Sequence, residues 1–264
     1  GKKYVNKRES NEENNMNEKS KQTTMINLQK AECVYSLVSL CTTQPYIVCD
    51  AETFDDQIYV YFDKDTAQRA SEKLMGEKIP VKMVTIPKNI YLPFYSSLFS
   101  MGVNRLVVDS GTDNEIGIQL NELIKRGKNP NGGEKQVVIE NPELHLTALY
   151  YMQEVKRDAK AQQREDMKEL YEEMLNHFQK GKYIVPARGD SKEVPLLKQQ
   201  NGDTFYPIFT DLLEFQKFCT SHKEEKWRSG IIEAQNLHKV MPDGVKGVTV
   251  NPMEVNLLLQ MVKK

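Results

Sequence analysis

The chain has 264 residues, of which 39% are hydrophobic and 28% are charged, and its formal net charge is -1 at pH 7. This balance gives no bulk attraction to nucleic acid or to an anionic membrane, so we expect neither as a partner. The sequence contains no apolar run of about 18 residues, the length that a membrane-spanning helix needs. Length and composition therefore predict a globular protein with one large or two small domains.

The chain contains four cysteines, Cys33, Cys41, Cys49 and Cys219. They form no CxxC pair, and no histidine lies at a metal-ligand spacing from them. Cys33, Cys41 and Cys49 sit among apolar residues, so we expect them to be buried, reduced thiols. So few cysteines in so long a chain argue against a disulfide framework and favour a cytoplasmic protein.

The first part of the chain begins with a polar stretch, residues 1–24, which predicts a solvated tail or a frayed helix. Apolar residues from Met25 to Leu40 recur at helical spacing and predict an amphipathic helix, which Pro45 ends. Strand patterns follow at residues 45–50, 57–63, 79–86 and 103–109. Helix patterns occupy residues 63–76, 92–102 and 112–127.

A polar segment with Pro and paired Gly, residues 129–139, is typical of a linker. The sequence therefore predicts two domains, residues 25–128 and residues 140–264.

In the second domain, Asn141 and Pro142 fit the cap and first turn of a helix. Helical spacing then continues through a segment that carries both charge signs to Phe178, so we expect one long helix. Further strands are predicted at residues 182–187, 194–200, 204–209, 227–234 and 247–251. Further helices are predicted at residues 210–222, 235–244 and 252–264.

The predicted elements of the two halves come in the same order. By eye, matching segments are Tyr46-Ile47-Val48 with Tyr183-Ile184-Val185, Phe62-Asp63 with Phe209-Thr210, and Val108-Asp109 with Val250-Asn251. A period of about half the chain favours the tandem duplication of a small domain. We expect an α/β fold, bordering on α+β, in which each domain is a mixed β-sheet flanked by helices. Hairpin neighbours should be antiparallel, and strands joined through helices should be parallel.

Four motifs in the second half resemble one known family: "NPELHLTALYYM", "YIVPA", "YPIFTDLLEF" and "GVTVNP". On these motifs, residues 140–262 resemble the SseB family, that is, the SseB N-terminal domain named for enhanced serine sensitivity. The first half resembles it only in outline, as a degenerate copy with "VYFDK" and "VDS" in place of "PIFTD" and "VNP". The resemblance implies the fold and the domain layout, and it brings no established enzymatic activity.

Motifs for common catalytic and cofactor sites are absent from the sequence. It contains no GxGxxG after a strand, no GxxxxGK[ST], no GxSxG elbow and no HExxH or HxxxH pair. We therefore assign no catalytic residue, no cofactor and no metal, and we expect a protein that is not an enzyme.

Ligands in α/β sheets favour the carboxyl ends of strands, and these ends supply the candidate ligand-binding residues. The candidates are Asp109, Ser110, Tyr206 and Asn251.

The "DSGT" turn that contains Asp109 and Ser110 has three interpretations. Its backbone N–H groups could hold an anion at a helix start, or Asp109 and Asp113 could hold a cation through oxygen ligands. The interpretation that we favour is a capping box, in which Thr112 and Glu115 satisfy the N–H groups of a following helix.

The candidates in the second half also have a structural interpretation. Pro207, next to Tyr206, predicts an edge strand or the end of a strand, with Thr210 or Asp211 capping the helix that follows. Asn251 with Pro252 predicts the cap and first turn of a C-terminal helix.

Two hypotheses about function remain. The first is a non-enzymatic protein-interaction or regulatory module with an unknown protein partner. The alternative is a small-molecule binder or a weakly marked enzyme that uses the strand-end loops, with a link to serine metabolism implied only by the family name. Neither the partner nor the oligomeric state can be read from the sequence.

Overall fold

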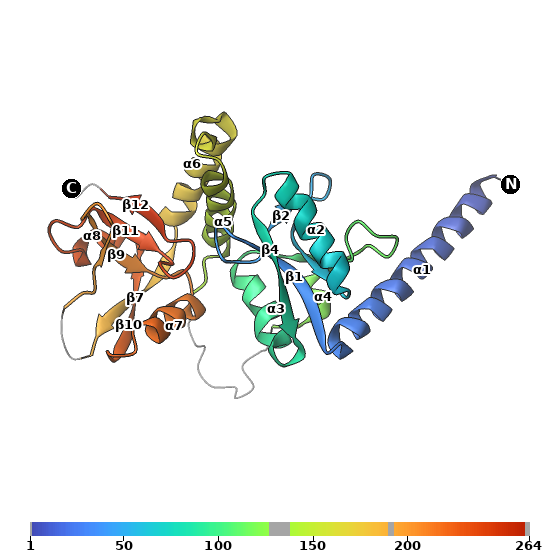
Figure 1. Ribbon diagram of the computed structural model, residues 1–264, viewed down its shortest axis with the longest axis horizontal. Coiled ribbons are helices and arrows are strands. Elements are labelled where there is room, and N and C mark those ends of the chain that lie inside the picture. Colours follow the sequence, from blue (N-terminus) through green and yellow to red (C-terminus); the bar gives the residue numbers. More distant parts are fainter. Residues whose placement is uncertain (1, 127–137, 190–192, 262–264) are drawn as a thin grey trace. The chain divides into compact units, whose positions relative to one another are not determined.

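The structure is a computed structural model that describes residues 2–126, 138–189 and 193–261. The chain divides into two compact units. Unit 1 comprises residues 1–38, 45–96 and 103–127, and unit 2 comprises residues 39–44, 97–102 and 128–264. Strands flanked by helices make up both units, which confirms the α/β class (Figure 1).

Unit 1 is built on a six-stranded sheet with the order β4-β1-β3-β5-β6, and β2 pairs with β3. Its elements are α1 (Lys2–Lys30), β1 (Cys33–Ser39), β2 (Val48–Cys49), β3 (Asp56–Tyr61), α2 (Lys64–Gly76), β4 (Val81–Pro87), η1 (Lys88–Ile90), α3 (Tyr91–Ser100), β5 (Arg105–Val108), β6 (Ile116–Gln119) and α4 (Leu120–Leu123); the last residue of β1 and the end of α3 are grouped with unit 2.

Unit 2 contains a four-stranded sheet with the order β12-β11-β9-β8 and a two-stranded sheet of β10 and β7. Its elements are α5 (Pro142–Arg157), η2 (Ala161–Gln163), α6 (Glu165–Gln179), β7 (Lys182–Arg188), β8 (Leu197–Lys198), β9 (Thr204–Ile208), α7 (Leu212–Ser221), β10 (Trp227–Glu233), η3 (Ala234–Asn236), α8 (Leu237–Val240), β11 (Gly247–Val250) and β12 (Leu257–Gln260). A single bridge between Ile184 and Phe209 links the two sheets.

The strand directions match the expectation. β3 and β5 are parallel, as are β9 and β11, and helices intervene in both cases. The neighbours β2 and β3, β8 and β9, β5 and β6, and β11 and β12 are antiparallel. The same series of pairings therefore occurs in each unit.

The register of the parallel pairs refines the match between the halves. Val60 lies opposite Val108, and Ile208 lies opposite Val250. Counting onward from these pairs aligns Asp63 with Asp211, one residue later than the sequence match of Asp63 with Thr210.

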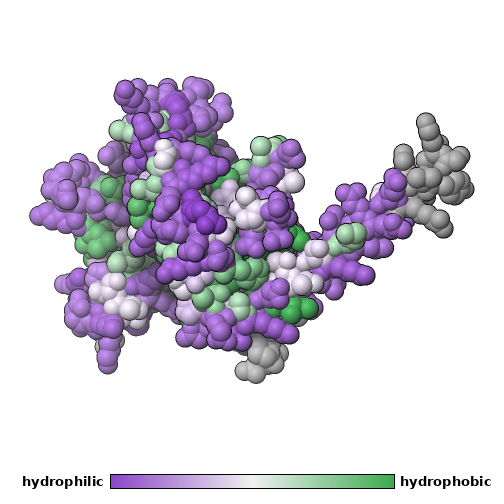
Figure 2. Space-filling view, turned by 45° about the vertical axis from the view of Figure 1, so that its right-hand side comes forward, coloured by the Kyte–Doolittle hydropathy of each residue, from purple (hydrophilic) through white to green (hydrophobic). Residues whose placement is uncertain are grey.

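Nearly continuous runs of buried residues along the central strands form the cores. In unit 1, Val60, Leu106 and Val108 are fully buried. In unit 2, Phe209 and Phe218 are fully buried, and their rings lie 5.2 Å apart. On the face drawn in Figure 2, hydrophilic residues cover most of the surface and apolar groups form separate patches.

The amphipathic helix expected from Met25 to Leu40 is wrong in its second half. Helix α1 ends at Lys30, and the chain turns into β1, whose Val34 and Leu37 are buried. A short run of apolar residues fits helical and strand spacing equally well, so pairing with β3 decides the outcome. Residues 2–24, where we expected a tail or a frayed helix, lie within α1.

The helices expected at residues 112–127 and 252–264 are also wrong, apart from the short helix α4 within the first of them. Residues 116–119 form β6, and residues 257–260 form β12, each antiparallel to its neighbour. Thr112 and Glu115 do not cap a helix; the Glu115 carboxylate accepts a hydrogen bond from the N–H of Gly111 at 3.0 Å. Residues after Asn251 form a turn, so Asn251 and Pro252 do not start a helix. Tertiary pairing overrides the helix propensity of Leu- and Glu-rich segments here.

Three further details differ from expectation. The long helix that should reach Phe178 breaks between α5 and α6, with η2 in the gap. β9 is not an edge strand, because it lies between β11 and β8; Pro207 lies beyond the part that β8 pairs with, which agrees with a strand end. The side chain of Asn141 makes no capping bond and instead donates to the carbonyls of Lys182 and Thr210.

All four cysteines are free thiols, as expected. Their burial differs from the expectation, because Cys49 is exposed and Cys33 and Cys41 are only partly buried. Most of the expected linker, up to residue 137, lies outside the described residues. In the part of the chain that the structure describes, no helix is long and apolar enough to cross a membrane.

Candidate functional site

The candidate residues Asp109 and Asn251 occupy matching positions at the ends of β5 and β11. Both have left-handed backbones, with φ of 53° and 49°, a conformation that Asp and Asn tolerate better than most residues. The N–H of Asp109 donates to the carbonyl of Val60 at 2.9 Å, and that of Asn251 donates to Ile208 at 3.0 Å. Each residue thus extends the pairing of its unit's two parallel strands by one hydrogen bond.

The side chains of Asp109 and Asn251 reach back to the neighbouring strand end. Oδ1 of Asp109 accepts from the N–H of Phe62 at 3.2 Å. Oδ1 of Asn251 accepts from the N–H of Thr210 at 3.0 Å, and its Nδ2 donates to Oγ1 of Thr210 at 2.9 Å. Burial raises the pKa of Asp109, against the opposing effect of the Phe62 N–H. Both candidates therefore have an evident structural role, and a ligand-binding role stays a prediction.

Ser110 lines a pocket of about 370 Å³ in unit 1, which lies along the length of α2. The other lining residues are Tyr59, Tyr61, Thr66, Arg69, Ala70, Lys73, Leu74, Glu77, Gly111 and Thr112. Hydroxyl groups and two basic side chains therefore gather at this strand end, but Asp109 is not among the lining residues.

The last candidate, Tyr206, lies on β9 and is only 2% exposed. Burial raises the pKa of its hydroxyl to about 12, so the phenol is neutral at physiological pH. No hydrogen bond in the described part of the chain joins Tyr206 to Asn251, so the two candidates of unit 2 do not form one site.

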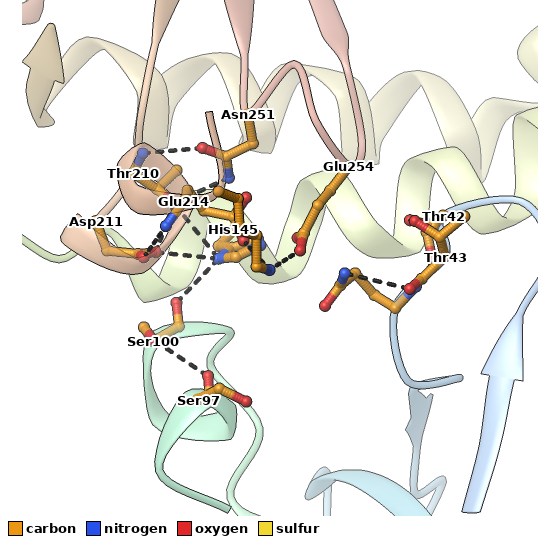
Figure 3. Close-up of polar contacts among 12 residues, drawn as sticks. Thr42, Thr43, Ser97, Ser100, His145, Thr210, Asp211, Glu214, Asn251 and Glu254 are labelled. Atoms are coloured by element: carbon orange, nitrogen blue, oxygen red, sulfur yellow. Dashed lines mark hydrogen bonds and ion pairs between the residues drawn. The ribbon is translucent and has the colours of Figure 1, made fainter. Parts of the chain in front are cut away.

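A cluster of ionisable side chains lies next to Asn251 in unit 2 (Figure 3), and all of them are buried except that of Lys217, which is 33% exposed. We call it the buried charge cluster, and it consists of His145, Asp211, Glu214, Lys217 and Glu254. His145 is on α5, Asp211 caps α7 and accepts from the N–H of Glu214 at 3.1 Å, and Lys217 lies one turn further along α7. Glu254 belongs to the turn between β11 and β12, in which the Asn251 carbonyl accepts hydrogen bonds from the backbone N–H groups that follow it.

One nitrogen of the His145 ring faces hydrogen-bond acceptors. Nδ1 lies 3.2 Å from the carbonyl of Ser100, which belongs to the same unit, and 3.6 Å from Oδ2 of Asp211. An imidazole nitrogen beside two acceptors carries the hydrogen, so Nε2 presents its lone pair in the neutral ring. His145 is only 1% exposed.

The pKa values of two carboxyl groups in the buried charge cluster, Asp211 and Glu214, are shifted in opposite directions. Burial would raise the pKa of Asp211, but the hydrogen bond and charge of His145, the N–H of Glu214 and the Thr210 hydroxyl outweigh it and lower that pKa. Burial raises the pKa of Glu214, against the attraction of Lys217 and His145. Hydrogen bonds and a neighbouring charge therefore outweigh burial at Asp211, whereas burial outweighs the opposing effects at Glu214.

Lys217 contacts one oxygen of each remaining carboxylate. Its Nζ lies 3.0 Å from Oε1 of Glu214 and also contacts Oε1 of Glu254. The second oxygen of each, Oε2, is buried without a hydrogen-bond partner, and so is Nε2 of His145. One ligand atom from each of His145, Glu214 and Glu254 lies within 4.8 Å of the others. Among the residues that the structure describes, these three are the ones grouped closely enough to hold a metal ion.

Sequence reasoning missed the buried charge cluster except for the capping role of Asp211. Part of the signal was present, because Asp211, Glu214 and Lys217 repeat at a spacing of three that places them along one helix face. His145 is 66 positions before Asp211 and Glu254 is 43 positions after it. No local pattern could connect them, so only the tertiary structure brings them together.

Unit 2 also contains an apolar groove of about 780 Å³ between α5, α6 and β12. It is lined by Tyr151, Met152, Val155, Lys156, Gln162, Met167, Lys168, Tyr171, Glu172, Asn256, Leu257 and Leu258. The rings of Tyr151 and Tyr171 lie 5.4 Å apart. The groove differs from the buried charge cluster in chemistry, because apolar side chains provide most of its lining.

Comparison with known proteins gives no family. No family model matches the sequence, and no curated protein matches it. Solved structures that align with the chain include Tic22 from Plasmodium falciparum, at 12% identity over 84% of this chain and 89% of that chain, with a TM-score of 0.22. Anabaena Tic22 (protein transport) aligns at 11% identity over 85% of this chain and 92% of that chain, also with a TM-score of 0.22. Likeness at this score supports no argument about fold or function.

Proposed function

We propose that this protein is a non-enzymatic protein-binding module, and that unit 2 binds an extended apolar segment of a partner protein. The observation that carries this proposal is the apolar groove that lies directly beside β12, an end strand of its sheet.

β12 is open to pairing. Within the described residues it pairs only with β11. Natural proteins protect such edges with charged side chains, Pro or bulges, but the segment from Asn256 to Met261 contains neither charge nor Pro. Leu258 is 39% exposed, whereas Leu257 is 3% exposed. An extended peptide can add to an edge of this kind as a further strand, through main-chain hydrogen bonds.

The groove supplies side-chain pockets for the same peptide. Met152 and Met167 are flexible and polarisable, and methionines of this kind adapt to different apolar partners. Lys156 and Lys168 are exposed at its rim, against the single carboxylate of Glu172. This excess of positive charge favours a partner segment in which apolar residues alternate and an acidic residue flanks them.

A displayed library of peptides about 12 residues long, with alternating apolar positions and one flanking acid, tests this function. We expect selected peptides to bind wild-type protein and to bind Leu258→Lys at least about 10-fold more weakly, because a buried charge would oppose the apolar contact. Ile231→Lys is the matched control, since Ile231 is also an exposed apolar residue on a strand of unit 2. Equal loss in both variants, or a library without binders, would contradict the proposal.

We also propose that the two units derive from one duplicated SseB-like domain. The support is the shared series of strand pairings and the matching backbone geometry at Asp109 and Asn251. A cytoplasmic location is part of the proposal, and the free state of all four cysteines agrees with a reducing compartment.

The alternative function, small-molecule binding, is favoured by one observation, the unit 1 pocket lined by Ser110. Arg69 and Lys73 at this pocket favour an anionic ligand, and Thr66 and Thr112 offer hydroxyl groups. A thermal-shift screen with amino acids, nucleotides and phosphate esters tests it. Stabilisation that Arg69→Ala abolishes would support this alternative, and absence of any stabilisation would reject it.

A further inference from the structure

The buried charge cluster contains more negative than positive charge. Asp211, Glu214 and Glu254 carry carboxyl groups, and within the described residues Lys217 is the ammonium group that contacts the two glutamates. Metal ligands must be deprotonated, and in that state, with three carboxylates and a neutral His145 ring, the single ammonium leaves two negative charges without compensation. A buried charge without a partner is costly, so a group of this kind requires a further cation or protons.

Three of the buried polar atoms that lack hydrogen-bond partners belong to this cluster, and their side chains each place one ligand atom within 4.8 Å of the others; the hydroxyl of Tyr95 and Nε of Arg188, outside the cluster, also lack hydrogen-bond partners. Nε2 of His145, Oε2 of Glu214 and Oε2 of Glu254 are buried and make no hydrogen bond. His145 and Glu214 are each 1% exposed, and the side chain of Glu254 is 4% exposed. Native proteins rarely leave buried polar atoms unsatisfied without a bound ion or water to account for them.

From these observations we infer that His145, Glu214 and Glu254 form a binding site for one divalent transition-metal ion of the Zn²⁺ or Mn²⁺ kind. Ligand atoms around such an ion lie about 3 to 4 Å from one another, because metal–ligand distances are about 2.0–2.2 Å. The observed upper limit of 4.8 Å between the three ligand atoms requires only a small contraction on binding. The ion supplies the two positive charges that the cluster lacks.

The ligand set determines the class of metal. One imidazole nitrogen with two carboxylate oxygens suits Zn²⁺ and Mn²⁺, whereas Mg²⁺ and Ca²⁺ favour oxygen ligands alone. A site with three protein ligands also leaves a coordination position for water.

The surroundings of the three ligands are those of a metal site. Asp211 lies beside Nδ1 of His145, which orients the ring so that Nε2 faces the two glutamates, as the carboxylate partners of metal-binding histidines do. Lys217 takes Oε1 of both glutamates and leaves Oε2 of each for the ion. Asp211 and Lys217 are positioning residues in this arrangement.

The test uses the full chain, freed of metal by a chelator and then titrated with Zn²⁺, Mn²⁺, Co²⁺ or Mg²⁺. Trp227, the single tryptophan, lies in unit 2, so its fluorescence reports the unfolding of the unit that contains the site. We expect one Zn²⁺ per chain and a rise in Tm of about 5 to 10 °C at 100 times Kd, with no such rise for Mg²⁺. Bound Co²⁺ should show the visible absorption of a nitrogen- and oxygen-liganded ion, without a thiolate charge-transfer band.

The variants separate this site from adventitious binding. Glu254→Gln and Glu214→Gln keep side-chain volume and should each weaken Zn²⁺ binding by about 100-fold, and Asp211→Asn, which can still cap α7, should weaken it by about 10- to 100-fold. His177→Gln is the matched control, because His177 and Glu173 form a surface pair at 3.4 Å. Should Glu214→Gln fail to fold, Glu254→Gln alone decides the matter. The inference is overturned if the wild-type protein binds none of the transition metals, which would mean that Lys217 and protons balance the cluster, or if both glutamine variants bind Zn²⁺ as the wild type does.

Discussion

In unit 1 the residue after β5 is Asp109, which accepts one hydrogen bond from the N–H of Phe62. In unit 2 the residue after β11 is Asn251, which binds both the N–H and the hydroxyl of Thr210. The backbone is left-handed at both positions and extends the strand pairing in the same way. The difference is burial, because Asn251 is 0% exposed and Asp109 is only partly buried.

The side chains around Asp109 and Asn251 also differ in their exposure. Thr112 lies three residues after Asp109 and donates its N–H to the Asp109 carbonyl. Glu254 lies three residues after Asn251 and donates its N–H to the Asn251 carbonyl in the same way. In unit 1 the nearby side chains are hydroxyl and basic groups that line an open pocket. In unit 2 they are carboxylates that His145 from α5 covers. The same backbone arrangement therefore lies beside an open polar pocket in unit 1 and beside a closed charged cluster in unit 2. The difference arises from helix α5, which covers the cluster in unit 2.

Alanine substitution at the two strand ends is the largest expected effect. Asn251→Ala should lower the free energy of unfolding by about 3 kcal/mol, because it leaves a buried N–H unsatisfied and places Ala in a left-handed backbone. Asp109→Ala carries the same backbone cost but loses a less buried bond, so we expect about 1.5 kcal/mol. Urea unfolding, followed by Trp227 fluorescence for unit 2 and by circular dichroism for the whole chain, measures both. Equal losses would show that burial does not distinguish the two strand ends.

Acid pH should affect the two units differently at the residue before β3 in unit 1 and the residue before β9 in unit 2. The hydrogen bond from Asn104 is the largest of the effects that lower the pKa of Asp55. Because the folded-state pKa lies below the unfolded value of about 3.9, ionised Asp55 stabilises unit 1 above that value and loses this contribution as the pH falls through the folded-state pKa. Asp55→Asn should therefore cost about 1 kcal/mol at pH 7 and less near pH 3. Asp203→Asn, at the residue before β9, is the control, and a loss that does not change with pH would contradict the prediction.

The smallest expected effect concerns the helix pair α5 and α6, which has no counterpart in the described part of unit 1. Arg164 at the start of α6 pairs with Glu154 at 2.8 Å and with Asp166 at 3.1 Å. These side chains are exposed or partly exposed, so Arg164→Ala should lower the free energy of unfolding only slightly, and less in about 1 M salt. Urea unfolding of this variant and of Glu169→Gln, at low and high salt, measures the difference. A loss as large as that of Asn251→Ala would mean that surface pairs stabilise unit 2 as strongly as its buried contacts.

Most elements could be predicted from the sequence, and the errors share one cause. Strands β3, β5, β9 and β11 carry continuous apolar or β-branched runs, and helices α2 and α7 begin at Asp63 and Asp211, whose side chains cap them. The segments that were wrong, β1, β6 and β12, are runs of at most seven residues with apolar side chains, so their residues fit either helix or strand. Pairing with a neighbour distant in sequence decided them.

The candidate site was partly visible in the sequence. Asn251 and Asp109 could be named as candidate ligand-binding residues because they follow strands in a predicted α/β sheet, although their ligand-binding role stays a prediction. Asp211 could be predicted as a helix cap. The role of Asn251 differs from the expected one, since it ties two strands together instead of starting a helix.

The sequence by itself determined the α/β class, most of the elements and the parallel pairing within each unit, because hydrophobic period and turn residues act locally. Tertiary structure alone decided that His145 lies beside Glu214 and Glu254, and that β12 forms one wall of a groove. The reason is that ion clusters and grooves depend on which distant segments pack together. The same Asn or Asp at a strand end becomes part of a closed cluster or of an open turn according to the helix that covers it.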